Sequence, residues 1–199
     1  MHQSVYDALR FAAKKHHKQE RSSKGAAIPY FDHILDVVRI LDMSRDEPLG
    51  AVNNTTLIVA ALHDTLEDTN TTYDEIVGAF GKLVADDVQS LTLPPEINGK
   101  ASPDVKFEHQ ANSILTMSTR AVLVKGADKL SNQTSLITAP PNWGKKAILG
   151  YSQHCVRLVT VARLELKTRL EPGHPALDAI NRIYSQALTE HQAVVKHYG

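Results

Sequence analysis

The stretch Leu57-Ile-Val-Ala-Ala-Leu-His-Asp-Thr-Leu-Glu-Asp68 decides the fold of this chain. Its first six residues are apolar all round a helix, which is typical of a helix at the centre of a bundle. We expect this helix to run from about Val52 to Leu66 and to lead directly into histidine and carboxylate side chains. Such groups need partners when they are buried. The stretch therefore predicts an all-α bundle with a reactive site at the end of its central helix.

Helical periodicity continues through the rest of the chain. Apolar residues recur at three- and four-residue spacing in the first segment, and Thr72 with Glu75 forms a capping box. Irregular segments at Arg21–Pro29, Leu93–Pro103 and Pro140-Pro141 separate the helices. We expect helices over about Val5–Lys18, His33–Met43, Val52–Leu66, Thr72–Phe80, Gly81–Leu91, Val105–Met117, Ala121–Leu136, Trp143–Leu170 and Pro175–His197. With no convincing strand pattern, the sequence predicts one domain over residues 1–199 with about eight or more helices.

Composition limits the possible functions. Lys plus Arg equals Asp plus Glu at 22 each, so no overall field would hold nucleic acid or a membrane surface. The single cysteine, Cys155, excludes an internal disulfide framework and a cysteine-rich zinc site in one chain. No stretch has the pattern of a signal peptide or a membrane span. We expect a cytoplasmic protein with no nucleic-acid or membrane partner, in which phosphate recognition is local.

The candidate chemistry lies where apolar helices end in ligating residues. Side chains from three helices are expected to bind one divalent cation: His33, His63, Asp64 and Asp128. Mixed imidazole and carboxylate ligation suits manganese, iron or zinc, and we favour one Mn²⁺ per site. Glu67 and Asp68 lie four residues after His63 and Asp64, on the next turn of the same side. We expect these two acids to orient a metal-activated water and to carry its proton.

An alternative interpretation applies to every histidine and acid at a helix end, because such residues usually cap helices or face solvent. We accept this interpretation for the remaining histidines: His16, His17, His109, His154, His174, His191 and His197. We reject it for the cluster at 63–68, where two adjacent ligating residues follow an apolar helix and two acids follow one turn later.

The ordered motifs resemble those of the HD-domain hydrolases of the Rel/SpoT alarmone enzymes, particularly the single-domain small alarmone hydrolases and metazoan SpoT homologues. The matching segments are Phe11-Ala-Ala-Lys-Lys-His16, Pro29-Tyr30-x-x-His33, Ala60-Ala-Leu-His-Asp-Thr-Leu-Glu-Asp-Thr69, Phe80-Gly81, Leu123-Val-Lys-Gly-Ala-Asp-Lys-Leu-Ser-Asn132 and Pro141-Asn-Trp143 through Tyr151. The resemblance implies Mn²⁺ on the four ligands, with Glu67 and Asp68 serving the attacking water. It also implies that the 3′-pyrophosphate is released intact from a hyperphosphorylated nucleotide.

The same resemblance implies a substrate-binding role for three residues. Arg21 would contact phosphate or stack on the base, Asn132 would hold the ribose, and Tyr151 would touch phosphate or sugar. Lys24 is a candidate phosphate ligand, and a solvated loop lysine is the alternative. Ser22-Ser23 stands where relatives commonly carry a second basic residue, so (p)ppApp is an alternative to (p)ppGpp.

Further departures surround the predicted ribose-binding asparagine. Ser131 and Gln133 replace bulkier residues, and Gly126 stands where an apolar residue is frequent.

Two other functions stay open: a general HD nucleotide phosphatase acting, for example, on NADPH or a nucleoside monophosphate, and a non-catalytic nucleotide-sensing module. The last helix carries an ordinary apolar face that suits either the core or a homodimer interface.

Overall fold

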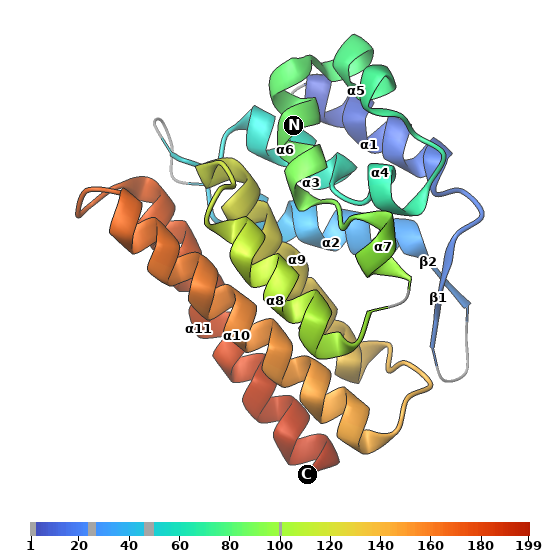
Figure 1. Cartoon of the computed structure of the whole chain (residues 1–199), viewed down its shortest axis with the longest axis vertical. Coiled ribbons are helices and arrows are strands. Elements are labelled where there is room, and N and C mark those ends of the chain that lie inside the picture. The colour runs from blue at the N-terminus through green and yellow to red at the C-terminus, as the bar shows by residue number, and fades with distance from the viewer. Residues whose placement is uncertain (1–2, 24–26, 46–49, 100) are drawn as a thin grey trace.

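The computed structural model describes residues 3–23, 27–45, 50–99 and 101–199. This part of the chain is almost entirely helical, with one antiparallel hairpin (Figure 1). Its elements are α1 (Gln3–Lys15), β1 (Glu20–Ser22), β2 (Ala27–Pro29), α2 (Tyr30–Asp42), α3 (Asn54–Leu62), α4 (Thr65–Asp68), α5 (Tyr73–Phe80), α6 (Lys82–Leu91), α7 (Pro95–Asn98), α8 (Pro103–Ile114), α9 (Thr119–Thr138), α10 (Lys145–Arg169) and α11 (Pro175–Tyr198). None of the described helices is long and apolar enough to cross a membrane. The predicted all-α bundle is confirmed.

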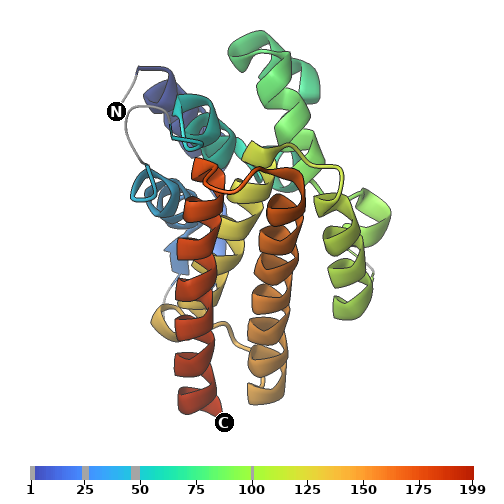
Figure 2. The same ribbon diagram turned by 90° about the vertical axis from the view of Figure 1, so that its left-hand side faces the viewer.

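Helix α9 is the centre of the bundle. It packs against α2, α3 and α6 and against the long helices α10 and α11, which lie side by side, orange and red, in Figure 2. Its residues from Ala121 to Asp128 are all buried. Helix α3 is buried over Thr56–Leu62 and packs against α1, α2, α6 and α9. These two helices therefore bring polar side chains into the interior, where they need partners.

Close packing between α9 and α11 explains an unusual glycine. A Cβ atom built on Gly126 would lie 3.0 Å from Cδ1 of Ile180 and 3.5 Å from Cγ2 of Ile183. A larger apolar residue at this position would push the two helices apart. The glycine is therefore a packing feature of the α9–α11 interface.

Helix α3 ends earlier than the sequence predicts for this segment. Helix α3 ends at Leu62, and after a turn at His63 and Asp64 the chain continues as the short helix α4. Asp64 has φ −102° and ψ 0°, in the sparsely populated region between helix and strand. The Thr65 hydroxyl donates to the carbonyl of Leu62 at 2.7 Å and stabilises this turn. The break redirects the chain at the two residues that were predicted to bind metal.

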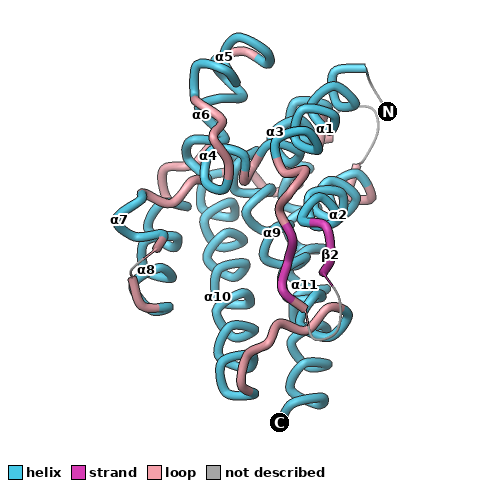
Figure 3. The backbone as a smooth tube through the Cα atoms, turned by 90° about the vertical axis from the view of Figure 1, so that its right-hand side faces the viewer, coloured by secondary structure: helices cyan, strands magenta, loops and turns pink. Residues whose placement is uncertain are grey.

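The sequence analysis was wrong about strands. Glu20–Ser22 and Ala27–Pro29 form an antiparallel hairpin, with Arg21 paired to Ile28 (Figure 3). Three residues are too few for an alternating pattern to be visible in the sequence. The irregular segment Leu93–Pro103 likewise contains the four-residue helix α7. The predicted capping box is confirmed, because Thr72 and Glu75 exchange hydrogen bonds at the start of α5.

Candidate active site

The four predicted metal ligands converge where α2, α9 and the α3–α4 turn meet. His33 Nε2 lies 3.6 Å from Asp64 Oδ2 and 3.4 Å from Asp128 Oδ1. His63 Nε2 lies 2.8 Å from Asp64 Oδ2 and 3.9 Å from Asp128 Oδ1. The candidate ligand atoms of His33, His63 and Asp64 all lie within 4.8 Å of one another. Residues from distant parts of the chain thus bring two imidazole nitrogens and one carboxylate together, and the carboxylate of Asp128 borders this group on the side of the two histidines.

Hydrogen bonds on the far side of one imidazole determine which nitrogen faces this point. Nδ1 of His63 lies 2.8 Å from the carbonyl oxygen of Ala60, and a carbonyl only accepts, so Nδ1 carries the proton. Nε2 of the neutral ring then presents a lone pair. This atom is buried, and although it lies 2.8 Å from Asp64 Oδ2, it forms no well-aligned hydrogen bond with the described residues. A divalent cation would satisfy it, so the donor set fits a metal ion.

The second imidazole is fixed from the side of α9. Nδ1 of His33 lies 2.9 Å from the hydroxyl of Ser131, and the ring packs edge-on against His63 with the two centroids 5.3 Å apart. Ser131 is one of the departures noted in the sequence, and a small hydroxyl there serves the histidine. A hydrogen bond of this kind orients a ligating imidazole.

Electrostatics keeps both carboxylates of the cluster ionised. Burial alone would raise the pKa of Asp128, but the ammonium of Lys129, 3.0 Å away, holds this pKa far below its usual range. Burial opposes ionisation of Asp64 in the same way, and the adjacent His63 imidazole holds the pKa of Asp64 well below normal. Burial lowers the pKa of His63, yet the carboxylates of Asp64 and Asp128 outweigh it and raise that pKa. The cluster attracts positive charge.

Tyr30 adds a hydrogen bond that the sequence analysis did not assign. Its hydroxyl donates to Asp64 Oδ2 at 2.6 Å. Burial, together with the Asp64 charge, raises the pKa of the phenol strongly, so Tyr30 stays protonated and remains a donor. Tyr30 lies three residues before His33, one helical turn away on α2, and this spacing is the signal that could have identified it.

The two predicted catalytic acids occupy α4 and make different contacts. Glu67 Oε2 accepts from the backbone N–H of Leu93 at 2.8 Å, and burial raises the pKa of Glu67. Asp68 Oδ2 accepts from the side-chain amide of Gln19 at 3.0 Å. Asp68 therefore contacts the segment after α1, whereas Glu67 contacts the segment after α6.

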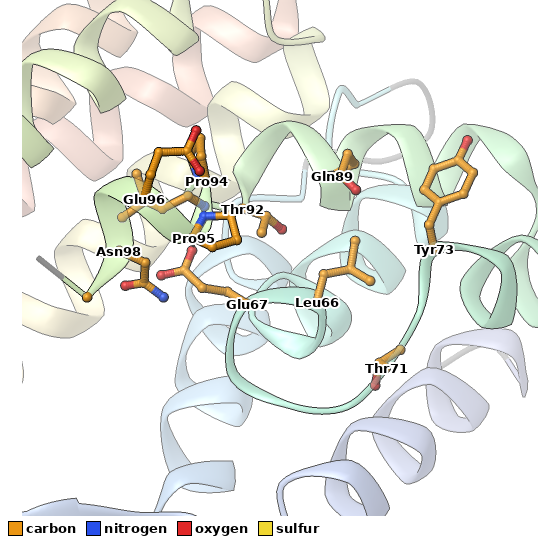
Figure 4. Close-up of a pocket in the computed structure, with 12 residues that line it drawn as sticks. Leu66, Glu67, Thr71, Tyr73, Gln89, Thr92, Pro94, Pro95, Glu96 and Asn98 are labelled. Atoms are coloured by element: carbon orange, nitrogen blue, oxygen red, sulfur yellow. Dashed lines mark hydrogen bonds between the residues drawn. The ribbon is translucent and has the colours of Figure 1, made fainter.

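Glu67 borders the cavity drawn in Figure 4, which measures about 710 Å³. The figure shows its side chain reaching toward Pro95 and Asn98, while Thr71 and Tyr73 lie at the other end of the same cavity. The four metal-ligand candidates do not line this space. Glu67, three residues after Asp64, is therefore the predicted catalytic acid that borders this cavity.

Three predicted substrate residues line a smaller cavity of about 260 Å³: Arg21, Asn132 and Tyr151. The guanidinium of Arg21 donates to Asn132 Oδ1, and the amide of Asn132 donates to Asp128. Arg21 also lies over the ring of Tyr30, with Cζ 5.7 Å from the centroid. Lys24, the fourth predicted residue, lies outside the described residues. The cavity is thus connected to the cluster through Asn132.

A third cavity, of about 400 Å³, adjoins the 260 Å³ cavity along Tyr151. Both cavities share Trp143 and Tyr151, whose rings meet edge to face with centroids 5.4 Å apart. The lining of the 400 Å³ cavity also includes Glu67 and two lysines, Lys106 and Lys129. The two cavities therefore share a wall made by Trp143 and Tyr151, and Asn132 in the smaller one bonds Asp128 of the cluster.

Two histidines differ from the expectation that they cap helices or face solvent. His16 is only 2% exposed, and its ring stacks on Tyr30 with the centroids 5.1 Å apart. His191 Nδ1 contacts the hydroxyl of Ser152 at 2.8 Å. His174 does cap a helix, because its Nδ1 accepts from the backbone N–H of Ala176 at the start of α11. The signal for His16 was its position at the end of an amphipathic helix, three residues before Gln19 and four before the first strand of the hairpin.

Comparison with known proteins gives consistent matches. The HD-domain family model matches residues 8–150. The guanosine-3′,5′-bis(diphosphate) 3′-pyrophosphohydrolase MESH1 of Xenopus tropicalis is 36% identical over 157 residues, 78% of this chain and 82% of that protein. MESH1 of Danio rerio is 35% identical over 158 residues, with the same 78% and 82% coverage. A solved structure described as a metazoan orthologue of SpoT that hydrolyses ppGpp has a TM-score of 0.71 at 24% identity, covering 94% of this chain and 96% of that one. At that identity the structural likeness establishes the fold.

Proposed function

Because the chain belongs to the HD-domain family and is a homologue of guanosine-3′,5′-bis(diphosphate) 3′-pyrophosphohydrolases, we propose that it hydrolyses (p)ppGpp to release pyrophosphate from the 3′ position. The observation that carries this proposal is the buried His63 Nε2, which lies 2.8 Å from Asp64 Oδ2 and 3.9 Å from Asp128 Oδ1 without a well-aligned hydrogen bond in the described chain. Two more acids follow within one helical turn. This combination supports hydrolysis assisted by a cation.

We assign the cation-binding role to His33, His63, Asp64 and Asp128, and the cation to Mn²⁺, because two nitrogens and two oxygens suit manganese better than magnesium. When bound, such an ion makes a water molecule more acidic and offsets charge on a phosphoryl group. Tyr30 supports this assignment by donating to Asp64 Oδ2, which orients that carboxylate.

Glu67 and Asp68 orient the attacking water and accept its proton. Burial raises the pKa of Glu67 toward the working pH, which suits a general base. The water oxygen forms a bond to the phosphorus attached to the ribose 3′ oxygen, and the bond between that phosphorus and the 3′ oxygen breaks. One proton of the water passes to the carboxylates, and these return a proton to the 3′ oxygen as it leaves. The products are pyrophosphate and a nucleotide with a free 3′-hydroxyl.

The smaller cavity suits the nucleoside. Its aromatic rings and the guanidinium of Arg21 offer flat surfaces for a base, and the amide of Asn132 can bond ribose hydroxyls. The adjoining cavity offers the ammonium groups of Lys106 and Lys129 to phosphate. A nucleotide phosphorylated at both ends of its ribose spans this arrangement.

Product analysis tests the proposal. The full chain, stripped of metal and supplied with Mn²⁺, is incubated with ppGpp, pppGpp, ppApp, pppApp and NADPH, and every product is identified. We expect pyrophosphate from ppGpp and pppGpp, and the adenosine substrates show how strictly the base is read. The Asp64→Ala variant should bind little Mn²⁺ and lose turnover while its circular dichroism spectrum is retained.

Asp74→Ala is the matched control, because Asp74 is an exposed acid on α5 outside the cluster. It should keep full activity. Release of orthophosphate alone would identify a general phosphatase. Tight binding of nucleotide with no turnover under any metal would identify a sensing module. Either result refutes the proposed hydrolysis.

A further inference from the structure

We propose that His16 and Gln19 are positioning residues that fix the orientation of the Asp68 carboxylate. This inference rests on the role proposed for Asp68 in hydrolysis. Neither residue contacts the metal-binding cluster through a hydrogen bond of its own in the described chain. Gln19 contacts Asp68 directly and also lines the smaller cavity, whereas His16 contacts Gln19 and stacks on the ring of Tyr30.

The direction of each proton follows from the chemistry of one end. An ionised carboxylate only accepts, so in the 3.0 Å contact with Asp68 Oδ2 the Nε2 amide of Gln19 is the donor. This places the amide oxygen of Gln19 toward His16, where Oε1 lies 2.6 Å from Nδ1. An amide oxygen also only accepts, so Nδ1 of His16 carries a proton. The three side chains form a directed chain from His16 through Gln19 to Asp68.

Packing does not require an imidazole at this position. The ring of His16 stacks on Tyr30 at an interplanar angle of 18°, and a phenylalanine ring could stack in the same way. His16 instead leaves Nε2 buried, with no hydrogen-bond partner found among the described residues. An unpartnered buried nitrogen costs stability. The one hydrogen bond that an imidazole adds over a phenyl ring here is the bond from Nδ1 to Gln19.

The hydrogen bonds from His16 through Gln19 to Asp68 leave one carboxylate oxygen of Asp68 free for the reaction. Gln19 engages Oδ2, so we assign Oδ1 to the attacking water. A carboxylate without this bond could rotate about its side-chain dihedral and present either oxygen in several directions. The stack with Tyr30 ties the same imidazole to the residue that donates to Asp64, so His16 supports both a ligand candidate and a catalytic acid.

The tautomer of His16 gives a test that needs neither substrate nor metal. Long-range ¹H–¹⁵N correlation spectra of the metal-free protein should show His16 with a protonated Nδ1 and an unprotonated Nε2. In Gln19→Met the acceptor is lost, and the Nδ1 proton should exchange faster with solvent. A His16 ring protonated at Nε2 alone would overturn the inference, whatever the enzyme does.

Kinetic measurements then test whether His16 and Gln19 position the Asp68 carboxylate. Gln19→Met should lower kcat about tenfold to a hundredfold with KM changed by less than about twofold, because a misplaced group costs rate more than binding. In an Asp68→Asn background the same Gln19→Met change should alter kcat by less than about twofold. An equal loss in both backgrounds would show that Gln19 acts on the fold alone.

Two variants of His16 separate the ring from its proton. His16→Phe keeps a ring to stack on Tyr30 but has no donor, and it should reproduce the loss seen in Gln19→Met. His16→Asn can donate from its amide near the Nδ1 position, and it should recover at least part of kcat. Full activity in His16→Phe would refute the proposal. A wild-type chain with no turnover would refute the proposed hydrolysis instead, and the tautomer measurement would still judge this inference.

Discussion

Glu67 carries its charge in a buried position that disfavours ionisation. Burial raises its pKa above that of a glutamate in the unfolded chain, so ionisation costs folding stability as the pH rises through the folded pKa. Glu67→Gln removes this charge and keeps an oxygen to accept from Leu93. We expect the metal-free variant to unfold at a higher temperature than wild type at pH 7, with the difference vanishing near pH 3, while hydrolysis is lost.

Glu75 is the matched control and should respond with the opposite sign. The ammonium of Lys15 and the N-cap bond with Thr72 lower the pKa of Glu75, so its ionised form stabilises the fold above the unfolded pKa. Glu75→Gln should therefore unfold at a lower temperature at pH 7. A Glu67→Gln variant that is also less stable at pH 7 would contradict the account of burial.

The Asp128–Lys129 pair makes a second prediction at the scale of residues. Burial would raise the pKa of Asp128, and the ammonium of Lys129, 3.0 Å from Asp128 Oδ2, is the largest of the effects that lower it. Lys129→Met leaves Asp128 without this partner, and breaking a buried pair costs about 3 to 5 kcal/mol. We expect urea unfolding of the metal-free variant to show a loss of that order.

Lys125 offers the comparison on the same helix. It is also buried, and its ammonium donates to the carbonyl of Leu91 at 3.1 Å; burial lowers its pKa. Because Lys125 forms no close ion pair with a carboxylate in the described chain, Lys125→Met should cost less than Lys129→Met. The reverse order would show that Asp128 does not depend on Lys129.

At the scale of elements, the α9–α11 contact is set by a single missing side chain. Gly126→Leu inserts four carbons where a Cβ would already lie 3.0 Å from Ile180, and overpacking of this kind costs about 1 to 3 kcal/mol. Gly150→Leu is the matched control, since a Cβ there meets no atom of the described chain within 4 Å and leucine favours a helix more than glycine. Urea unfolding should show a loss for the first variant and no loss for the second. Equal stability of both would mean that the helices adjust without cost.

Local sequence signals predicted most elements correctly because helix periodicity and caps act within a few residues. The Thr72–Glu75 capping box and the buried stretch of α3 are examples. The hairpin and the early end of α3 were missed because tertiary contacts determine them. Arg21 bonds Asn132 on α9, and Tyr30 on α2 bonds Asp64 at the break. These bonds join residues that are 111 and 34 positions apart, so periodicity and caps could not predict the partners.

The same limit separates the parts of the candidate site. His63, Asp64, Glu67 and Asp68 lie within six residues, so their spacing alone pointed to chemistry. The role of Gln19 could not be predicted, because its bond to Asp68 spans 49 residues and depends on how an amide is oriented. Long-range side-chain hydrogen bonds require the folded structure.

For the whole molecule, the cluster is a junction between three separate segments. His33 comes from α2, His63 and Asp64 from the α3–α4 turn, and Asp128 from α9. An ion held by all of them binds only the folded chain, so it stabilises the whole fold by mass action, by about 2.7 kcal/mol at a hundred times its dissociation constant. Thermal unfolding with Mn²⁺ should occur several degrees higher than after chelation. The shift should be absent in Asp64→Ala and retained in Asp74→Ala.

The size of this stabilisation should also depend on pH, in a direction that the cluster fixes. Neighbouring carboxylates raise the pKa of His63, and only the neutral ring offers Nε2 to a cation, so protons compete with the metal. As the pH falls through the raised pKa, the increase in unfolding temperature caused by Mn²⁺ should shrink, and titration calorimetry should record protons released on binding. Metal stabilisation that stays constant from pH 8 to pH 5 would show that His63 is not a ligand. In that case the three segments would be joined by hydrogen bonds and ion pairs among the side chains themselves.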